Sequence, residues 1–237
     1  MREEKYLKEH LLNINDDSLK EITDFFGLDK CIEIYHNLVD AINIEKIDFN
    51  IFLSFAYYDN ALSEILFTLL RHQENHVKAF LCNVFNDYQV QIEARPSNYS
   101  KTKYYFKIPV GVNKYLDIRT HNYERGPIDY YDAIKTLDFY DVNLIMFHLP
   151  RSLVDKLSPS PHILDDLDKT RQLRNYVYHH NMLFSLGKEE LEHSILLVIN
   201  NLPNDDLKVL YKNKIDNIKL NISDKLINKL IKVNITL

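Results

Sequence analysis

Residues 48–88, with the sequence DFNIFLSFAYYDNALSEILFTLLRHQENHVKAFLCNVFNDY, carry the most regular apolar pattern in the chain. Apolar side chains recur in this segment at intervals of three and four residues, the spacing that lines one face of an α-helix. The positions are Ile51, Phe55, Tyr58, Leu62, Ile65, Leu66 and Leu69. We therefore predict one long helix, or two stacked helices, that forms the spine of a helical bundle.

The overall composition favours the same fold class. The 237 residues include only four glycines and seven prolines, so few chain breakers are present for an architecture of short strands and tight turns. Hydrophobic residues make up 46% of the chain and charged residues 27%, which is typical of a globular protein. We predict an all-α fold with long helices, organised as a single domain over residues 1–237.

The N-terminal part of this domain, residues 1–92, reads as helical throughout. Residues 1–45 show the pattern of two or three amphipathic helices. The triplet Asp16–Ser18 offers residues that cap helix N-termini, and Gly27 is a residue type that ends helices. We expect a further helix from about Asp29 to Ile44.

The next segment, residues 93–127, changes character. It contains three prolines and two glycines among many tyrosine, asparagine and lysine residues. The stretch YYFKIPVGV, residues 104–112, has the β-branched and aromatic content of a strand or hairpin. We predict a small irregular or β-hairpin insertion here, followed by a return to helical periodicity over residues 128–237.

In this C-terminal part, the sequence Ser158-Pro159-Ser160-Pro161 interrupts the helical pattern. Proline favours the first turn of a helix and serine favours the cap that precedes it. We therefore predict a helix over residues 162–184, before Gly187, and further helices from residue 188 to the end of the chain.

Charge and cysteine content limit the possible partners and cofactors. The net charge of −5 gives no general basic surface for nucleic acid, although a local basic cleft is compatible with it. Cys31 and Cys82 lack the spacing of a zinc site or a disulfide framework, so we expect no metal and no cofactor. The N-terminus has no apolar signal region, and polar residues interrupt the richest apolar run, Ile51–Leu70. We expect a soluble, cytoplasmic protein that makes no contact with a membrane.

One segment brings together side chains that could take part in catalysis. LRNYVYHHNMLF, residues 173–184, places Arg174, Asn175, His179 and His180 close together in the predicted 162–184 helix, with Arg171 one turn earlier. Glycine-rich phosphate loops and metalloprotease or serine-hydrolase motifs are absent from the sequence. An arginine and a histidine without a metal-binding cluster are suited to binding and cleaving a phosphodiester.

This segment resembles the R-x4-6-H signature of HEPN ribonucleases. It is more narrowly similar to the RN-x-x-x-HH-x-R-L segment of the bacterial abortive-infection (Abi) proteins, a phage-defence group with HEPN folds, and the similarity extends over about residues 129–203. The resemblance implies a HEPN-like helical bundle with Arg174 and His179 as catalytic residues. The sequence departs from the pattern at Met182, where the family usually has an arginine that would help to hold RNA.

The bare spacing of the motif has low specificity. With the numbers of arginines and histidines present, chance alone produces roughly 0.3 such pairs in a chain of this length. Arg71 and His76 stand at the same spacing, so Arg71, Glu74 and His76 form a second candidate polar site. Such a polar turn on a long helix is more often its solvated face, although Glu74 would line the cleft if the helices pack together.

The position of Arg174 on the predicted helix leaves two interpretations open. At 100° per residue it shares a face with Ile163, Leu167, Val177 and Phe184. A guanidinium group on an apolar face is costly unless it is paired or faces a polar cleft. One interpretation is a structural ion pair; in the other, the face packs against a second protomer and Arg174 lines the cleft between them.

The relative placement of the two motif residues favours the interpretation with a second protomer. Arg174 and His179 are about 140° apart on an ideal helix, so they converge on one phosphate most easily in a composite site of a two-fold dimer. Asn175 is four residues from His179, shares its face, and would orient the imidazole. His180 is either a helper at the site or an exposed neighbour.

We therefore expect a metal-independent endoribonuclease that cleaves single-stranded or looped RNA by transesterification. The Abi resemblance implies a role in phage defence, or as a toxin restrained by an antitoxin or a regulatory RNA. The alternative is a non-catalytic HEPN-like module that binds RNA, a nucleotide or a partner protein, which the acidic net charge and Met182 favour. A purely structural bundle is the third possibility.

Overall fold

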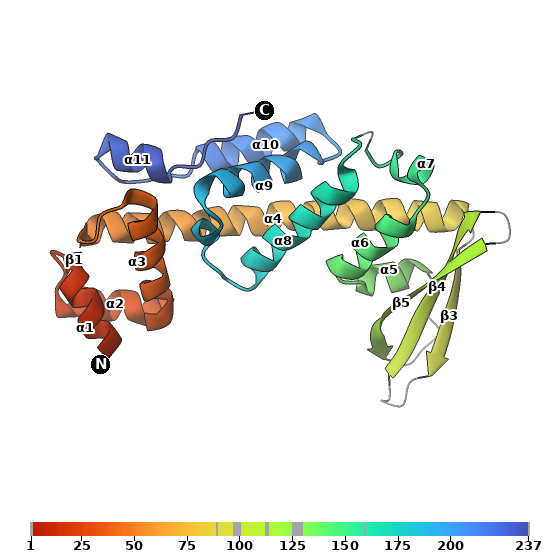
Figure 1. The fold of residues 1–237 in the computed structure, drawn as a ribbon, viewed down its shortest axis with the longest axis horizontal. Helices are drawn as coiled ribbons and strands as arrows, with labels where there is room; N and C mark the ends of the chain where they lie inside the picture. The colour runs from red at the N-terminus through yellow and green to blue at the C-terminus, as the bar shows by residue number, and fades with distance from the viewer. Residues whose placement is uncertain are drawn as a thin grey trace. The chain divides into compact units, whose positions relative to one another are not determined.

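The structure of the chain is a computed structural model that describes residues 2–88, 90–96, 101–111, 114–124, 130–158 and 160–236. Most of these residues are helical (Figure 1), which confirms the prediction of a mainly helical fold with long helices. The helices are α1 (Arg2–His10), α2 (Asp16–Phe26), α3 (Leu28–Ile42), α4 (Phe49–Asp87), α5 (Tyr130–Thr136), α6 (Phe139–His148), α7 (Arg151–Val154), α8 (Ile163–Tyr178), α9 (Lys188–Asn200), α10 (Asp205–Asp216) and α11 (Lys225–Ile231), with a 3₁₀ helix at Leu183–Leu186. Of the helices described, none has both the length and the apolar character needed to span a bilayer.

Contacts within the chain divide it into two compact units. Unit 1 comprises residues 1–69, 173–200 and 204–237, and unit 2 comprises residues 70–172 and 201–203. Helices α4 and α8 each contribute residues to both units.

The long apolar segment forms one helix, α4, of 39 residues (Figure 1). The sequence was compatible with one long helix or with two stacked helices, and the structure has one long helix. Five of the seven positions on the predicted stripe are buried, whereas Ile51 and Ile65 are half-buried. The stripe therefore identified the face of α4 that enters the core.

The N-terminal helices of unit 1 also follow the prediction. Gly27 ends α2 with a φ of +85°, and its N–H donates to the carbonyl of Thr23; such a positive φ suits glycine because it has no Cβ. The cap of α2 differs by one residue from the expected triplet. Asn15 is the capping residue, and its side chain accepts the N–H of Ser18 at 2.8 Å.

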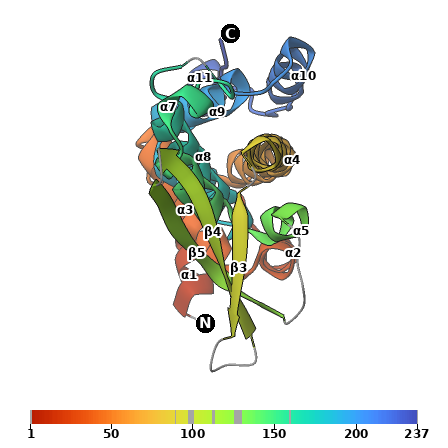
Figure 2. The same ribbon diagram turned by 90° about the vertical axis from the view of Figure 1, so that its right-hand side faces the viewer.

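The segment predicted as an irregular or hairpin insertion contains more strand than expected. In unit 2, β3 (Gln91–Pro96), β4 (Lys101–Gly111) and β5 (Lys114–Glu124) form an antiparallel sheet in the order β3-β4-β5 (Figure 2). A second, minimal sheet in unit 1 joins β1 (Leu11–Leu12) to β2 (Ile47–Asp48) in parallel.

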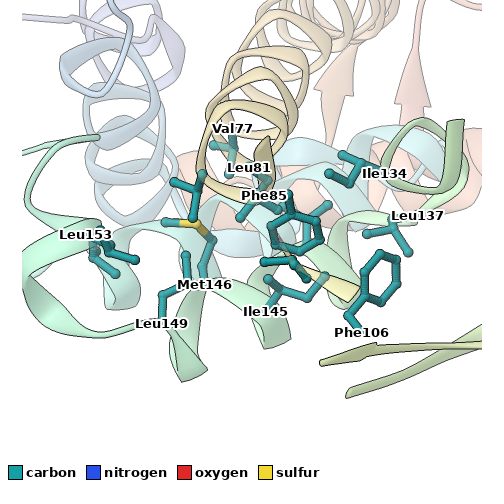
Figure 3. Close-up of a cluster of buried hydrophobic side chains, with 14 of the residues drawn as sticks. Val77, Leu81, Phe85, Phe106, Ile134, Leu137, Ile145, Met146, Leu149 and Leu153 are labelled. Atoms are coloured by element: carbon teal, nitrogen blue, oxygen red, sulfur yellow. The ribbon is translucent and has the colours of Figure 1, made fainter. Parts of the chain in front are cut away.

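The core of unit 2 explains how the sheet is attached (Figure 3). Phe106 of β4 is fully buried, and its ring centre lies 5.4 Å from that of Phe85 on α4. The same cluster includes side chains from α5, α6, α7 and the first half of α8. Because Phe106 enters this cluster, the sheet is part of the hydrophobic core of unit 2 and is not a detached loop.

Candidate functional site

The motif segment ends helix α8 earlier than predicted. The last helical residue is Tyr178, and His180 adopts a left-handed φ of +54°. The N–H of His180 donates to the carbonyl of Val177, and the N–H of Asn181 donates to that of Tyr176. These two bonds form a Schellman motif, in which a left-handed residue satisfies the last carbonyls of a helix.

This ending corrects the predicted 162–184 helix. Arg174 and Asn175 lie within α8, whereas His179 and His180 belong to the turn that follows it. We call residues 179–183 the motif turn. His179 keeps the helical backbone bond from its N–H to the carbonyl of Asn175, at 3.0 Å, so the chain leaves the helix directly after it.

Three side chains of unit 1 fix the backbone of the motif turn. They are Lys30 and Glu33 on α3 and Asp59 on α4. Lys30 Nζ donates to the carbonyl of His180 at 2.8 Å, Glu33 Oε1 accepts the N–H of Met182 at 3.1 Å, and Asp59 Oδ1 accepts the N–H of Leu183 at 3.0 Å. Hydrogen bonds to charged groups are among the stronger ones in proteins, so the turn has a defined conformation.

Asp59 is a buried carboxyl group, with only 5% of its surface exposed. Burial raises its pKa to about 7, and this effect outweighs the positive charge of Lys30 and the backbone N–H groups of Leu183 and Phe184, which lower it. A carboxylate removed from water loses solvation that a few hydrogen bonds do not fully replace. Asp59 therefore changes its charge state near neutral pH.

The guanidinium of Arg174 lies against an aromatic ring. Its Cζ is 4.1 Å from the ring centre of Tyr178, one turn later on α8. The Tyr178 ring is also stacked on the ring of Phe67 of α4, with ring centres 4.6 Å apart. A cation over an aromatic face gains electrostatic attraction and keeps its charge. We call Arg174, Tyr178 and Phe67 the arginine stack.

The imidazole of His179 is exposed. In the part of the chain that the structure describes, it takes part in no hydrogen bond or ion pair. Among the described residues, the bond that joins Asn175 and His179 is the one between their backbones, and the Asn175 amide makes no hydrogen bond to this ring. An exposed imidazole is free to exchange protons with a substrate.

The apolar face that we expected to meet a second protomer is buried within the chain. Ile163 and Leu167 belong to the core of unit 2, and Val177 is 2% exposed. Phe184 lies beyond the helix and packs on Phe55 with ring centres 5.0 Å apart. A dimer must therefore use a different surface from this face.

The supporting residue Arg171 lies in unit 2. Its Nε and Nη2 atoms contact Asp168 Oδ1 at 2.9 and 2.8 Å. The Arg171 guanidinium also holds the pKa of the Asp168 carboxyl below its usual range, together with the Gln172 amide, and these effects outweigh burial, which raises it. Arg171 is thus largely committed to a structural ion pair.

The second candidate polar site consists of residues with unlike environments. Arg71 is exposed, whereas Glu74 is buried and forms an ion pair with Lys78 at 2.8 Å. His76 is half-buried, and burial lowers its pKa. Glu74 therefore has a structural partner on its own helix. The structure adds no support for a second polar site at Arg71 and His76.

Met182 lies in the core, with 1% of its surface exposed. The position at which the Abi pattern has arginine therefore points away from solvent in this chain. Among the described residues, no group of histidine, cysteine and acidic side chains is arranged to hold a metal ion.

Sequence reasoning missed the three residues that fix the motif turn. Asp59 did leave a signal, because it is a charged residue in the apolar run Ile51–Leu70 and follows Tyr58 of the stripe directly. A charge beside a core position has to be paired or hydrogen-bonded. Lys30 and Glu33 show no comparable signal.

Comparison of the chain with protein-family models, with curated proteins and with solved structures finds no match.

Proposed function

We propose that the chain is a metal-independent endoribonuclease whose site is formed by Arg174 and His179. The observation that carries the proposal is the arrangement at the end of α8. A guanidinium held in the arginine stack precedes an exposed imidazole on a turn with a fixed backbone. This pairing supplies a permanent cation for a phosphate and an imidazole that can accept or donate a proton.

The proposed reaction needs no nucleophile from the protein. The 2′-oxygen of a ribose attacks the adjacent phosphorus, its proton is removed, the bond from phosphorus to the 5′-oxygen breaks, and that oxygen gains a proton. His179 performs one of the two proton transfers. Arg174 binds the phosphate oxygens and offsets the charge that develops on them. The products are a 2′,3′-cyclic phosphate and a 5′-hydroxyl.

The requirement for a 2′-hydroxyl provides the test of the proposal. We expect cleavage of a single-stranded RNA oligonucleotide in EDTA and no cleavage of the DNA oligonucleotide of the same sequence. A single 2′-deoxy substitution should abolish cleavage at that linkage alone. Cleavage of DNA, or cleavage at the substituted linkage, would contradict the mechanism.

Arg174 variants separate charge from geometry. Arg174→Ala should lower the cleavage rate about 100-fold, because the phosphate loses its paired donors. Arg174→Lys should recover part of this loss, since it keeps the charge but not the planar fork. Arg151→Ala, at an exposed arginine of α7, is the matched control and should leave the rate unchanged. Equal rates for the wild type and Arg174→Ala would remove Arg174 from the site.

We also propose that the site is composite in a homodimer, because residues at the spacing of Arg174 and His179 face about 140° apart on an ideal helix. Dimers made only of Arg174→Ala chains, or only of His179→Ala chains, then keep about one hundredth of the activity or less. When the two are co-expressed, half of the dimers are mixed and one of their two sites is intact, so about a quarter of the wild-type activity should return. A mixture no more active than either variant would place both residues of a site on one chain.

A second candidate function is a non-catalytic module that binds RNA. The burial of Met182 favours it, because that position supplies no cation to the substrate. In this case RNA binding should fall with Arg174→Ala, while the wild-type protein shows no cleavage. The biological role proposed with the nuclease is RNA destruction in phage defence, or as a toxin under the control of an antitoxin or a regulatory RNA.

A further inference from the structure

A cavity of about 440 Å³ borders the motif turn within unit 1. Its wall includes Phe25 and Phe26 at the end of α2, Asp59 and Asn60 on α4, and His180 and Asn181 of the motif turn. The volume lies in the range of small-molecule sites. Two of these residues, His180 and Asn181, directly follow the proposed catalytic residue His179 in the sequence.

One wall of the cavity is aromatic and open to solvent. The rings of Phe25 and Phe26 contact each other with centres 4.7 Å apart, and Phe25 is 66% exposed. Tyr57 extends the group, with its ring centre 5.8 Å from that of Phe26. Exposed rings that are held by their neighbours provide a flat apolar face, and nucleic-acid bases stack on such faces.

The rest of the lining is polar and can bind the edge of a base. Asn60 donates its amide N–H to Glu64 Oε1 at 3.1 Å, which leaves its carbonyl oxygen as an acceptor. The Asn181 side chain is exposed, with both a donor and an acceptor. Asp59 adds a buried carboxyl group whose pKa of about 7 lets it act as donor or acceptor near neutrality.

A cation also lies at this cavity. Lys30 contributes to its lining, is partly exposed, and already bonds to Glu33 and to the carbonyl of His180. A ligand with an apolar flat body, hydrogen-bonding edges and a negative charge fits this combination of groups. A nucleotide of single-stranded RNA has all three properties.

We infer that this cavity is a base-binding subsite, in which one unpaired nucleobase of the RNA stacks on Phe25 and is hydrogen-bonded by Asn60 and Asn181. The inference rests on the proposed ribonuclease function, because it assigns the substrate contact next to His179. The subsite makes the enzyme select the nucleotide beside the bond that it cleaves.

The first arm of the test is binding without cleavage. The probes are the four nucleoside 3′-monophosphates, with ribose phosphate as the ligand that lacks a base. We expect at least one nucleotide to bind ten times or more tighter than ribose phosphate, and Phe25→Ala and Asn181→Ala to reduce this preference about tenfold. Phe147→Ala is the matched control, because Phe147 is 67% exposed and lies in unit 2. If no nucleotide binds better than ribose phosphate, the inference is overturned.

The second arm is cleavage of RNA homopolymers by the full chain. The wild type should cleave one homopolymer at least tenfold faster than the others, and Phe25→Ala should level the rates while Phe147→Ala does not. Nucleotide binding without any RNA cleavage would overturn the ribonuclease proposal and leave the subsite standing. RNA cleavage with equal rates on all homopolymers would overturn the subsite alone.

Discussion

Replacing His179 with alanine is expected to lower the rate of RNA cleavage by roughly 10²- to 10⁴-fold, the contribution of a positioned acid or base. The fold should be unaffected, because the imidazole is exposed and makes no hydrogen bond among the described residues. The measurement is the initial rate on a fluorescent single-stranded RNA in EDTA, with circular dichroism to compare the folded state of each variant.

The control for this variant is His193→Ala, which removes an exposed imidazole on α9 of the same unit. It should cleave RNA at the wild-type rate. In cells, wild-type expression should slow growth if the chain is a toxin, and expression of His179→Ala should not. A His179→Ala protein with full cleavage activity would show that the imidazole takes no part in the reaction.

Replacing Asp59 with asparagine is expected to change the pH dependence of stability. Burial raises the pKa of Asp59 to about 7, above its value of about 3.9 in an unfolded chain. The folded state therefore disfavours the carboxylate, and its stability falls as the pH rises toward 7. Between pH 5 and pH 8 the wild type should lose on the order of 2–3 kcal/mol through this group.

The amide introduced by Asp59→Asn keeps an oxygen to accept the N–H of Leu183 and cannot ionise. The free energy of unfolding, measured in urea at both pH values, should fall less for Asp59→Asn than for the wild type. At pH 8 the variant should be the more stable protein. Asp24→Asn changes an exposed carboxylate on α2 and should follow the wild type. If Asp59→Asn follows the wild type as well, Asp59 is already charged at pH 5.

The spine of the fold was predictable from the sequence because its signal is local. The stripe on α4 repeats over many turns, and Gly27 ends a helix at a conformation that favours glycine. The sheet was only partly predictable. Phe106 is buried by side chains that lie far from it in sequence, Phe85 among them, and no local pattern specifies that contact.

The candidate site shows the same division between local and distant causes. The residues of the motif were identified from their spacing, but the end of α8 was not, because no glycine or proline marks it. His180 adopts its left-handed φ in a turn held by Lys30 and Asp59. These side chains lie 150 and 124 residues away in sequence from the groups that they bind. The helical pattern contains no trace of these distant contacts, so the prediction placed the end of the helix too late.

The chemical identity of the RNA ends tests the central claim most directly. An RNA oligonucleotide is incubated in EDTA with the wild type or with His179→Ala, and the products are analysed by mass spectrometry. We predict that the wild type yields fragments with 2′,3′-cyclic phosphates and 5′-hydroxyls, and that the variant yields almost none. Fragments with 5′-phosphates, no fragments from the wild type, or the same fragments from both proteins would contradict a nuclease site at Arg174 and His179.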